Sequence, residues 1–127
     1  MKGRLHIFRK NKETEYREKI MVKHINGKEL EELVAGSQQT VFCDFWANWC
    51  GPCRMLAPVF EEISNKYENQ ATFVKVDIDD EESESAAIKY GISSIPNVIA
   101  FKGGKPVANS LGFVPAPVLE NFVKNNL

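Results

Sequence analysis

The chain has 127 residues, of which 43% are hydrophobic and 26% charged, and its formal net charge is −1. A chain of this length forms one domain around a single core. It has no run of about 18 apolar residues, so we expect no membrane span. The apolar run LHIF (residues 5–8) is shorter than the roughly 7–15 residues of a signal-peptide core. We therefore expect a cytoplasmic protein, in a compartment where thiols stay reduced.

Charge is unevenly distributed along the chain. Residues 1–20 carry seven Lys or Arg and three Glu, a balance of +4, whereas residues 21–127 carry nine and fourteen, a balance of −5. Residues 1–20 also lack a sustained apolar period, so we expect a basic extension there and a folded domain over residues 21–127. This extension does not have the aromatic-and-basic pattern that would indicate a nucleic-acid-binding arm. The three Glu argue against a transit peptide.

From residue 21 onward, apolar periodicity alternates between strand and helix patterns. The segment 40–47 is β-branched, aromatic and almost wholly apolar, as is typical of a strand covered on both faces. Pro58 falls inside a long helical pattern and should kink that helix, because proline removes a backbone donor. The expected elements are strand 21–25, helix 26–34, strand 40–47, helix 52–67, strand 71–78, a helix within 80–91, a hairpin over 97–112 that turns at Gly103 and Gly104, and helix 116–126.

This order of elements predicts an α/β sandwich. Helices separate the first three strands, which can therefore pair in parallel, and the hairpin adds antiparallel strands. In such sheets functional sites gather at the carboxyl ends of strands. Residues 46–50, WANWC, lie between the end of a strand and the start of a helix, so we expect the chemistry there.

Cys50 and Cys53 are separated only by Gly51 and Pro52. If Cys50 begins a helix, Cys53 lies one turn on, with Cβ atoms roughly 5–6 Å apart, and a disulfide can open and close with little backbone movement. Gly51 lets the backbone turn, and Pro52 suits a first helical turn. Free N–H groups and the helix dipole favour a thiolate at Cys50, while the deeper Cys53 should stay protonated longer.

Two thiols in this arrangement favour thiol–disulfide exchange. Cys50 would attack a substrate disulfide, and Cys53 would then displace the substrate thiol. The second step needs a proton acceptor, for which Asp44 is the candidate, since a carboxyl in an apolar strand needs a raised pKa or a partner. Lys75 on a neighbouring strand is its expected partner. A buried ion pair with a purely structural role is the alternative.

Other roles for the cysteines fit less well. A structural zinc site usually needs four ligands, and beside the one pair the chain offers only Cys43, His6 and His24, so we expect no metal. Cys43 and Asp44 alternate along their strand and should point to opposite faces. Cys43 is then a small buried residue or, alternatively, a regulatory thiol.

The segment DFWANWCGPCRMLAP (residues 44–58) closely resembles the active-site segment of the thioredoxin family, whose signature is W-C-G-P-C. The segments VKVDID (residues 74–79) and YGISSIPN (residues 90–97) extend the resemblance to about residues 21–127. It implies the thioredoxin fold, a three-layer α/β/α sandwich with a mixed five-stranded sheet in the order 3-1-2-4-5. The implied function is that of a protein-disulfide reductant, a thiol–disulfide oxidoreductase that carries electrons.

The resemblance also implies roles for individual residues. Cys50 would be the nucleophile and Cys53 the resolving thiol of a redox disulfide tuned by Gly51 and Pro52. Asp44 matches the family's buried aspartate, with Lys75 as its neighbour. The remaining matches are Pro58 as the helix-kinking proline, Pro96 as a cis-proline, and Trp49, Ile95, Pro96, Gly112 and Phe113 as the lining of a shallow apolar substrate groove. All of these groove residues except Trp49 also fit a core or turn role.

The implied partners are an NADPH-dependent flavoprotein thioredoxin reductase and disulfide-containing enzymes such as ribonucleotide reductase, peroxiredoxins and methionine sulfoxide reductases. The expected protein is a monomer that binds no cofactor, nucleic acid or membrane. Three features depart from the family pattern: Asn97 instead of the usual Thr, a longer acidic segment with five carboxylates over residues 79–84, and the basic extension. An oxidant or isomerase, and a partner-binding subunit with a secondary redox pair, are the alternative functions.

Overall fold

The computed structural model describes residues 11–13 and 22–127. The basic extension expected over residues 1–20 therefore lies outside the described residues, apart from positions 11–13. No helix in the described ranges is long and apolar enough to cross a membrane.

The elements follow the predicted alternation of strands and helices. They are β1 (Lys23–Ile25), α2 (Gly27–Gly36), β2 (Thr40–Trp46), α3 (Gly51–Lys66), β3 (Ala71–Asp77), η1 (Glu81–Ser83), α4 (Glu84–Lys89), β4 (Asn97–Lys102), β5 (Lys105–Leu111) and α5 (Ala116–Lys124). The helix predicted within residues 80–91 is in fact a short 3-10 turn, η1, followed by the six-residue α4. Asp80 caps η1 by accepting a hydrogen bond from the Glu82 N–H, which favours a tight turn there.

The sheet has five strands in the order β1-β3-β2-β4-β5. The mixed five-stranded α/β sheet is confirmed, but the predicted order 3-1-2-4-5 placed the first strand inside the sheet, whereas it lies at the edge. The physical reason is burial. β1 has three residues, mostly exposed, while β3 has seven, mostly buried, and therefore occupies the interior position.

The pairing directions follow the connections. β1, β3 and β2 pair in parallel, and β4 runs antiparallel to both β2 and β5. β4 and β5 form the predicted hairpin, which turns at Gly103 and Gly104. Both glycines have positive φ, +61° and +81°, where a side chain would be strained.

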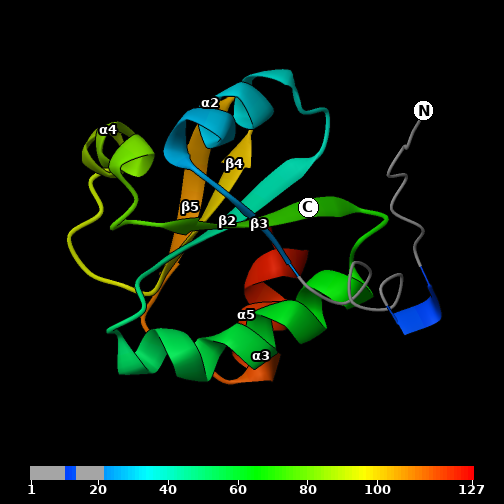
Figure 1. Ribbon diagram of the computed structural model, residues 1–127. Helices are drawn as coiled ribbons and strands as arrows, with labels where there is room; N and C mark the ends of the chain where they lie inside the picture. The colour runs from blue at the N-terminus through cyan, green and yellow to red at the C-terminus, as the bar shows by residue number, and fades with distance from the viewer. Residues whose placement is uncertain (1–10, 14–21) are drawn as a thin grey trace, which may run out of the picture.

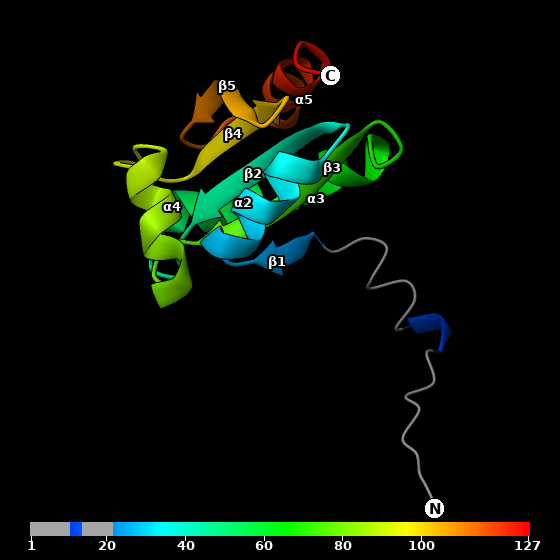
Figure 2. The same ribbon diagram turned by 90° about the horizontal axis from the view of Figure 1, so that it is seen from above.

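Helices cover both faces of the sheet and make the three layers (Figure 1). One core cluster joins α3 and α5 to the sheet through residues such as Phe42, Phe60 and Leu119. The other joins α2 to the opposite face, with Leu30 and Val41 among its members. Seen from above, β1 and β5 lie at opposite edges of the sheet (Figure 2).

The helix that bears the cysteine pair, α3, begins at Gly51 and continues through Pro58 to Lys66. Leu56, Phe60 and Ile63 form its buried stripe, at spacings of three and four residues. This stripe packs into the α3–α5 cluster and holds α3 against the sheet.

Candidate functional site

The site begins where β2 ends. Every residue of β2 is buried except Trp46, which is partly exposed. Residues 47–50 then connect this strand to α3. Ala47, Cys50 and Cys53 form a small cluster of their own against Trp46 and the partly buried side chains of Ile78 and Ile95.

Cys50 and Cys53 form a disulfide, with Cα atoms 5.2 Å apart. Cys50 is the N-cap of α3, and its Sγ accepts a hydrogen bond of 3.2 Å from the Cys53 N–H. Pro52 lies in the first helical turn, where its missing N–H leaves no bond unmade. Cys50 is 5% exposed and Cys53 2% exposed. The Cys50 sulfur is therefore positioned at the positive end of a helix, where a thiolate is stabilised.

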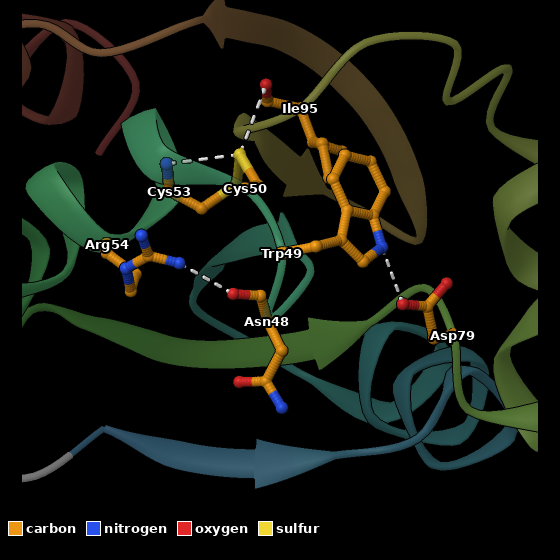
Figure 3. Close-up of a disulfide and its surroundings, with 7 residues drawn as sticks. All are labelled: Asn48, Trp49, Cys50, Cys53, Arg54, Asp79 and Ile95. Atoms are coloured by element: carbon orange, nitrogen blue, oxygen red, sulfur yellow. Dashed lines mark hydrogen bonds between the residues drawn. A yellow bond between two sulfur atoms is a disulfide. The ribbon is translucent and has the colours of Figure 1, made fainter.

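Two hydrogen bonds hold the loop before the disulfide (Figure 3). Trp49 is 67% exposed, and its Nε1–H donates a bond of 2.8 Å to Asp79 Oδ2. Arg54 Nη1 donates a bond of 2.8 Å to the Asn48 carbonyl. The exposed indole ring is thus oriented by a carboxylate from the loop after β3, a contact that sequence analysis missed because the two residues are 30 positions apart.

The loop before β4 lies directly opposite the disulfide. The Ile95 carbonyl oxygen is 3.7 Å from the Cys50 Sγ, as Figure 3 shows. The Ile95–Pro96 peptide bond is cis, as the family resemblance implied. The Gly112 N–H donates a bond of 2.8 Å to the Pro96 carbonyl, and Gly112 has a φ of +82°. The structure therefore places the Ile95 carbonyl beside Cys50, with Gly112 hydrogen-bonded to the adjoining Pro96.

Asp44 is completely buried, two residues before the end of β2. Neither oxygen of its carboxylate has a hydrogen-bond partner among the described residues. Burial raises the pKa of Asp44 to about 7, against the opposing influence of the Lys75 ammonium. A carboxyl with this pKa exchanges a proton near neutral pH.

Lys75 lies opposite Asp44 in the β2–β3 register and is also buried. Its ammonium is not hydrogen-bonded to that carboxylate. The Lys75 Nζ lies instead 4.9 Å from the centroid of the Trp46 ring. The sequence pattern does not distinguish Trp46, because an aromatic residue at the end of an apolar strand has the pattern of an ordinary core residue.

The other candidate residues lie apart from the disulfide. Cys43 is buried in the cluster on the α2 face, opposite to the face that bears Asp44, as strand alternation predicted. Burial raises the pKa of Cys43 well above its ordinary value, which disfavours a reactive thiolate. Among residues 11–13 and 22–127, no group of three or more His, Cys, Asp or Glu could hold a metal ion.

Comparison with known proteins agrees with this geometry. The thioredoxin family model matches residues 21–125. The chain is 37% identical to thioredoxin from Haemophilus influenzae over 106 residues, which cover 84% of this chain and 97% of the relative. It is 43% identical to thioredoxin from Bacillus subtilis over 91 residues, 72% of this chain and 86% of the relative. It is also 43% identical to the chloroplastic M-type thioredoxin of Pisum sativum over 103 residues, 81% of this chain and 59% of the relative.

The family model and these relatives show that the chain belongs to the thioredoxin family, and the disulfide at the N-terminus of α3 agrees with that family's W-C-G-P-C signature. It is a thiol–disulfide oxidoreductase, a dithiol–disulfide reductant that works through the Cys50–Cys53 pair. The predicted activity is confirmed at this level.

Proposed function

We propose that Cys50 is the nucleophile of the exchange and Cys53 the resolving thiol. The Cys50 thiolate attacks one sulfur of a substrate disulfide, so that a Cys50–substrate disulfide forms and the first substrate thiolate leaves. Cys53 loses its proton and attacks the Cys50 sulfur. The Cys50–Cys53 disulfide forms and the second substrate thiolate leaves, so the substrate gains the two electrons that the protein loses. The helix N-cap position of Cys50 is the observation that carries this assignment.

Asp44 is the proposed acceptor of the Cys53 proton, with Lys75 as the cation that modulates it. Support comes from the buried, unpaired carboxylate and from its pKa of about 7. A base with this pKa is half-ionised near neutral pH, where the exchange would operate.

The proposed substrate surface consists of Trp49, Ile95, Pro96 and Gly112 beside the disulfide, with exposed Phe113 at its margin. The Ile95 carbonyl lies close to the Cys50 sulfur, and an extended substrate segment could pair with backbone groups of this loop. Gly51 and Pro52 are the proposed tuning residues between the thiols.

The finer cellular role is also a proposal. We place the folded domain at residues 21–127, acting as a monomer in the cytoplasm. We expect an NADPH-dependent thioredoxin reductase to reduce it, and proteins such as peroxiredoxins, ribonucleotide reductase and methionine sulfoxide reductases to oxidise it. The M-type relative in Pisum sativum is chloroplastic by name, so fractionation of the source cells is the test of location.

The decisive experiment is the reduction potential of the Cys50–Cys53 pair, measured by equilibration with a defined thiol–disulfide buffer. Thioredoxin has a reduction potential of about −270 mV, and we expect a similar value for this pair. A value of about −180 mV or higher would instead assign the protein to the isomerases and oxidants. Replacement of both thiols with Ser would leave partner capture intact only for a binding subunit.

A further inference from the structure

Three neighbouring strands place His24, Lys75 and Asp44 in one row. The β1–β3 register pairs His24 with Lys75, and the β2–β3 register pairs Asp44 with Lys75. Residues paired in this way share one face of a sheet and have neighbouring Cβ atoms. The simplest expectation is therefore a direct ion pair between the Lys75 ammonium and the buried Asp44 carboxylate.

The Lys75 ammonium instead lies over an aromatic ring. Its Nζ is 4.9 Å from the centroid of the Trp46 indole, and both Asp44 oxygens are without a hydrogen-bond partner in the described part of the chain. Trp46 follows Asp44 by two residues along β2, so it lies on the same face of the sheet. The negative face of the indole and the carboxylate thus compete for one buried cation.

The imidazole of His24 contacts the same indole ring. The imidazole and the Trp46 indole have centroids 5.5 Å apart and an interplanar angle of 82°. The Trp46 Nε1–H is buried and has no hydrogen-bond partner within the described residues. The described contacts that orient the indole are therefore packing contacts, with the Lys75 ammonium on the ring and the edge-to-face imidazole beside it.

We propose that Trp46 is a positioning residue for the exchange reaction: its indole ring holds the Lys75 ammonium away from Asp44, so that this carboxylate stays unpaired and able to take the Cys53 proton. The proposal deepens the proposed function and rests on the role given there to Asp44. A direct ion pair would stabilise the ionised carboxylate and weaken its affinity for a proton. Without the ring, Asp44 would be the weaker base.

Glu61 and Asp77 act on the pKa of His24, and Lys75 acts on the pKa of both His24 and Asp44. Burial and Lys75 lower the pKa of His24, against the opposing influence of Glu61 on α3 and Asp77 on β3, which favours the neutral imidazole. In the oxidised protein neither Cys50 nor Cys53 titrates, because both are in the disulfide. Among the described residues, the Lys75 ammonium is then the charge that acts on the pKa of Asp44, and it lowers that pKa.

A double-mutant cycle on the oxidised full chain tests the proposal, with the Asp44 carboxyl followed by its ¹³C shift as pH is varied. Trp46→Leu should lower the Asp44 pKa by about one unit, a tenfold change in proton affinity. Trp46→Phe keeps an aromatic face and should restore most of that affinity. It also serves as the variant to titrate if Trp46→Leu unfolds. Lys75→Met alone should raise the Asp44 pKa, because it removes the cation that lowers it.

The cycle closes with Trp46→Leu in the Lys75→Met background, where no change in the Asp44 pKa is expected. An equal fall of the Asp44 pKa in both backgrounds would overturn the proposal, since the ring would then act only by excluding water.

The pH profile of disulfide reduction by Trp46→Leu should shift to lower pH together with the Asp44 pKa. If the Asp44 pKa changes as expected but the pH profile of disulfide reduction does not shift, Asp44 is not the proton acceptor. The catalytic part of the proposal then fails with it. If Asp44→Asn removes the pH dependence of reduction but Trp46→Leu leaves the Asp44 pKa unchanged, only the Trp46 proposal fails.

Discussion

Trp49, the most exposed aromatic residue beside the disulfide, donates its indole N–H to Asp79 over 2.8 Å. Asp79 opens the acidic segment that distinguishes this chain from the common family pattern. The other end of the segment is also anchored, because the Gly27 N–H donates a buried hydrogen bond of 3.0 Å to Ser83 Oγ. The acidic segment is therefore attached to the loop before the disulfide at one end and to the start of α2 at the other.

Replacing Asp79 with Ala should raise KM for a protein disulfide more than it lowers kcat. The lost hydrogen bond leaves the exposed Trp49 ring free to reorient, and an exposed bond of this kind is worth about 0.5–1.5 kcal/mol. A free energy of this size corresponds to a rise in KM of roughly twofold to tenfold. Asp80→Ala is the matched control. It removes the same charge, but the Asp80 carboxylate accepts its hydrogen bond from the Glu82 N–H and not from Trp49. Equal effects of the two variants would show that charge alone acts.

Cys53→Ser should trap a mixed disulfide between Cys50 and a disulfide-containing protein, because the resolving thiol is missing. Cys50→Ser should trap none, since Cys53 is 2% exposed beneath the first turn of α3. Non-reducing electrophoresis and mass measurement detect the complex. Cys43→Ala added to Cys53→Ser should leave trapping unchanged. Trapping by Cys50→Ser would reverse the assignment of the two thiols.

Asp44 should make the oxidised protein less stable as the pH rises from about 4 to 7. The folded-state pKa is about 7, above the unfolded value of about 3.9. Between these values the folded state holds a proton that the unfolded state has lost. Stability from this group is therefore complete below the unfolded pKa and is lost as pH rises through the folded one. The three-unit difference corresponds to roughly 4 kcal/mol at most.

Urea unfolding of wild type and Asp44→Asn at pH 5 and pH 8 measures this effect. The variant cannot ionise at residue 44, so its stability should fall less between the two pH values, by about 2 kcal/mol or more. At pH 8 it should be the more stable protein even though its amide stays buried. Parallel pH dependences of the two proteins would mean that Asp44 is not buried as a high-pKa acid.

Gly27→Ala should destabilise the fold by about 1–3 kcal/mol, because the new methyl has no room. A Cβ at this position would lie 2.7 Å from the Ala86 Cβ and 2.9 Å from the Ser83 Cα. Gly36→Ala is the control in the same helix, where nothing lies within 4 Å, and it should be neutral or stabilising since Ala favours helix. Thermal or urea unfolding of both variants compares them directly. A stable Gly27→Ala protein would mean that η1 and α4 can shift away from α2.

Local patterns predicted most of the secondary structure because each depends on neighbours along the chain. Leu56, Phe60 and Ile63 recur at helical spacing, and the glycine pair at residues 103–104 marks a hairpin turn. The capping box at Asn26 and Glu29, which the structure shows, is also a short-range feature. The position of β1 was wrong because the strand order depends on which strand buries more apolar surface against both helix layers, and that comparison spans the whole sheet.

The sequence by itself determined the chemistry: two cysteines three positions apart at the start of a helix, with one carboxyl in an otherwise apolar strand. Those features depend on residue type and spacing over a few turns of chain. The tertiary structure alone decided where the Lys75 cation lies, that Asp79 orients Trp49, and that Ile95 faces Cys50. These contacts join segments 29 to 45 positions apart. Their geometry follows from strand register and loop packing, in which a lysine has both an indole face and a carboxylate within reach.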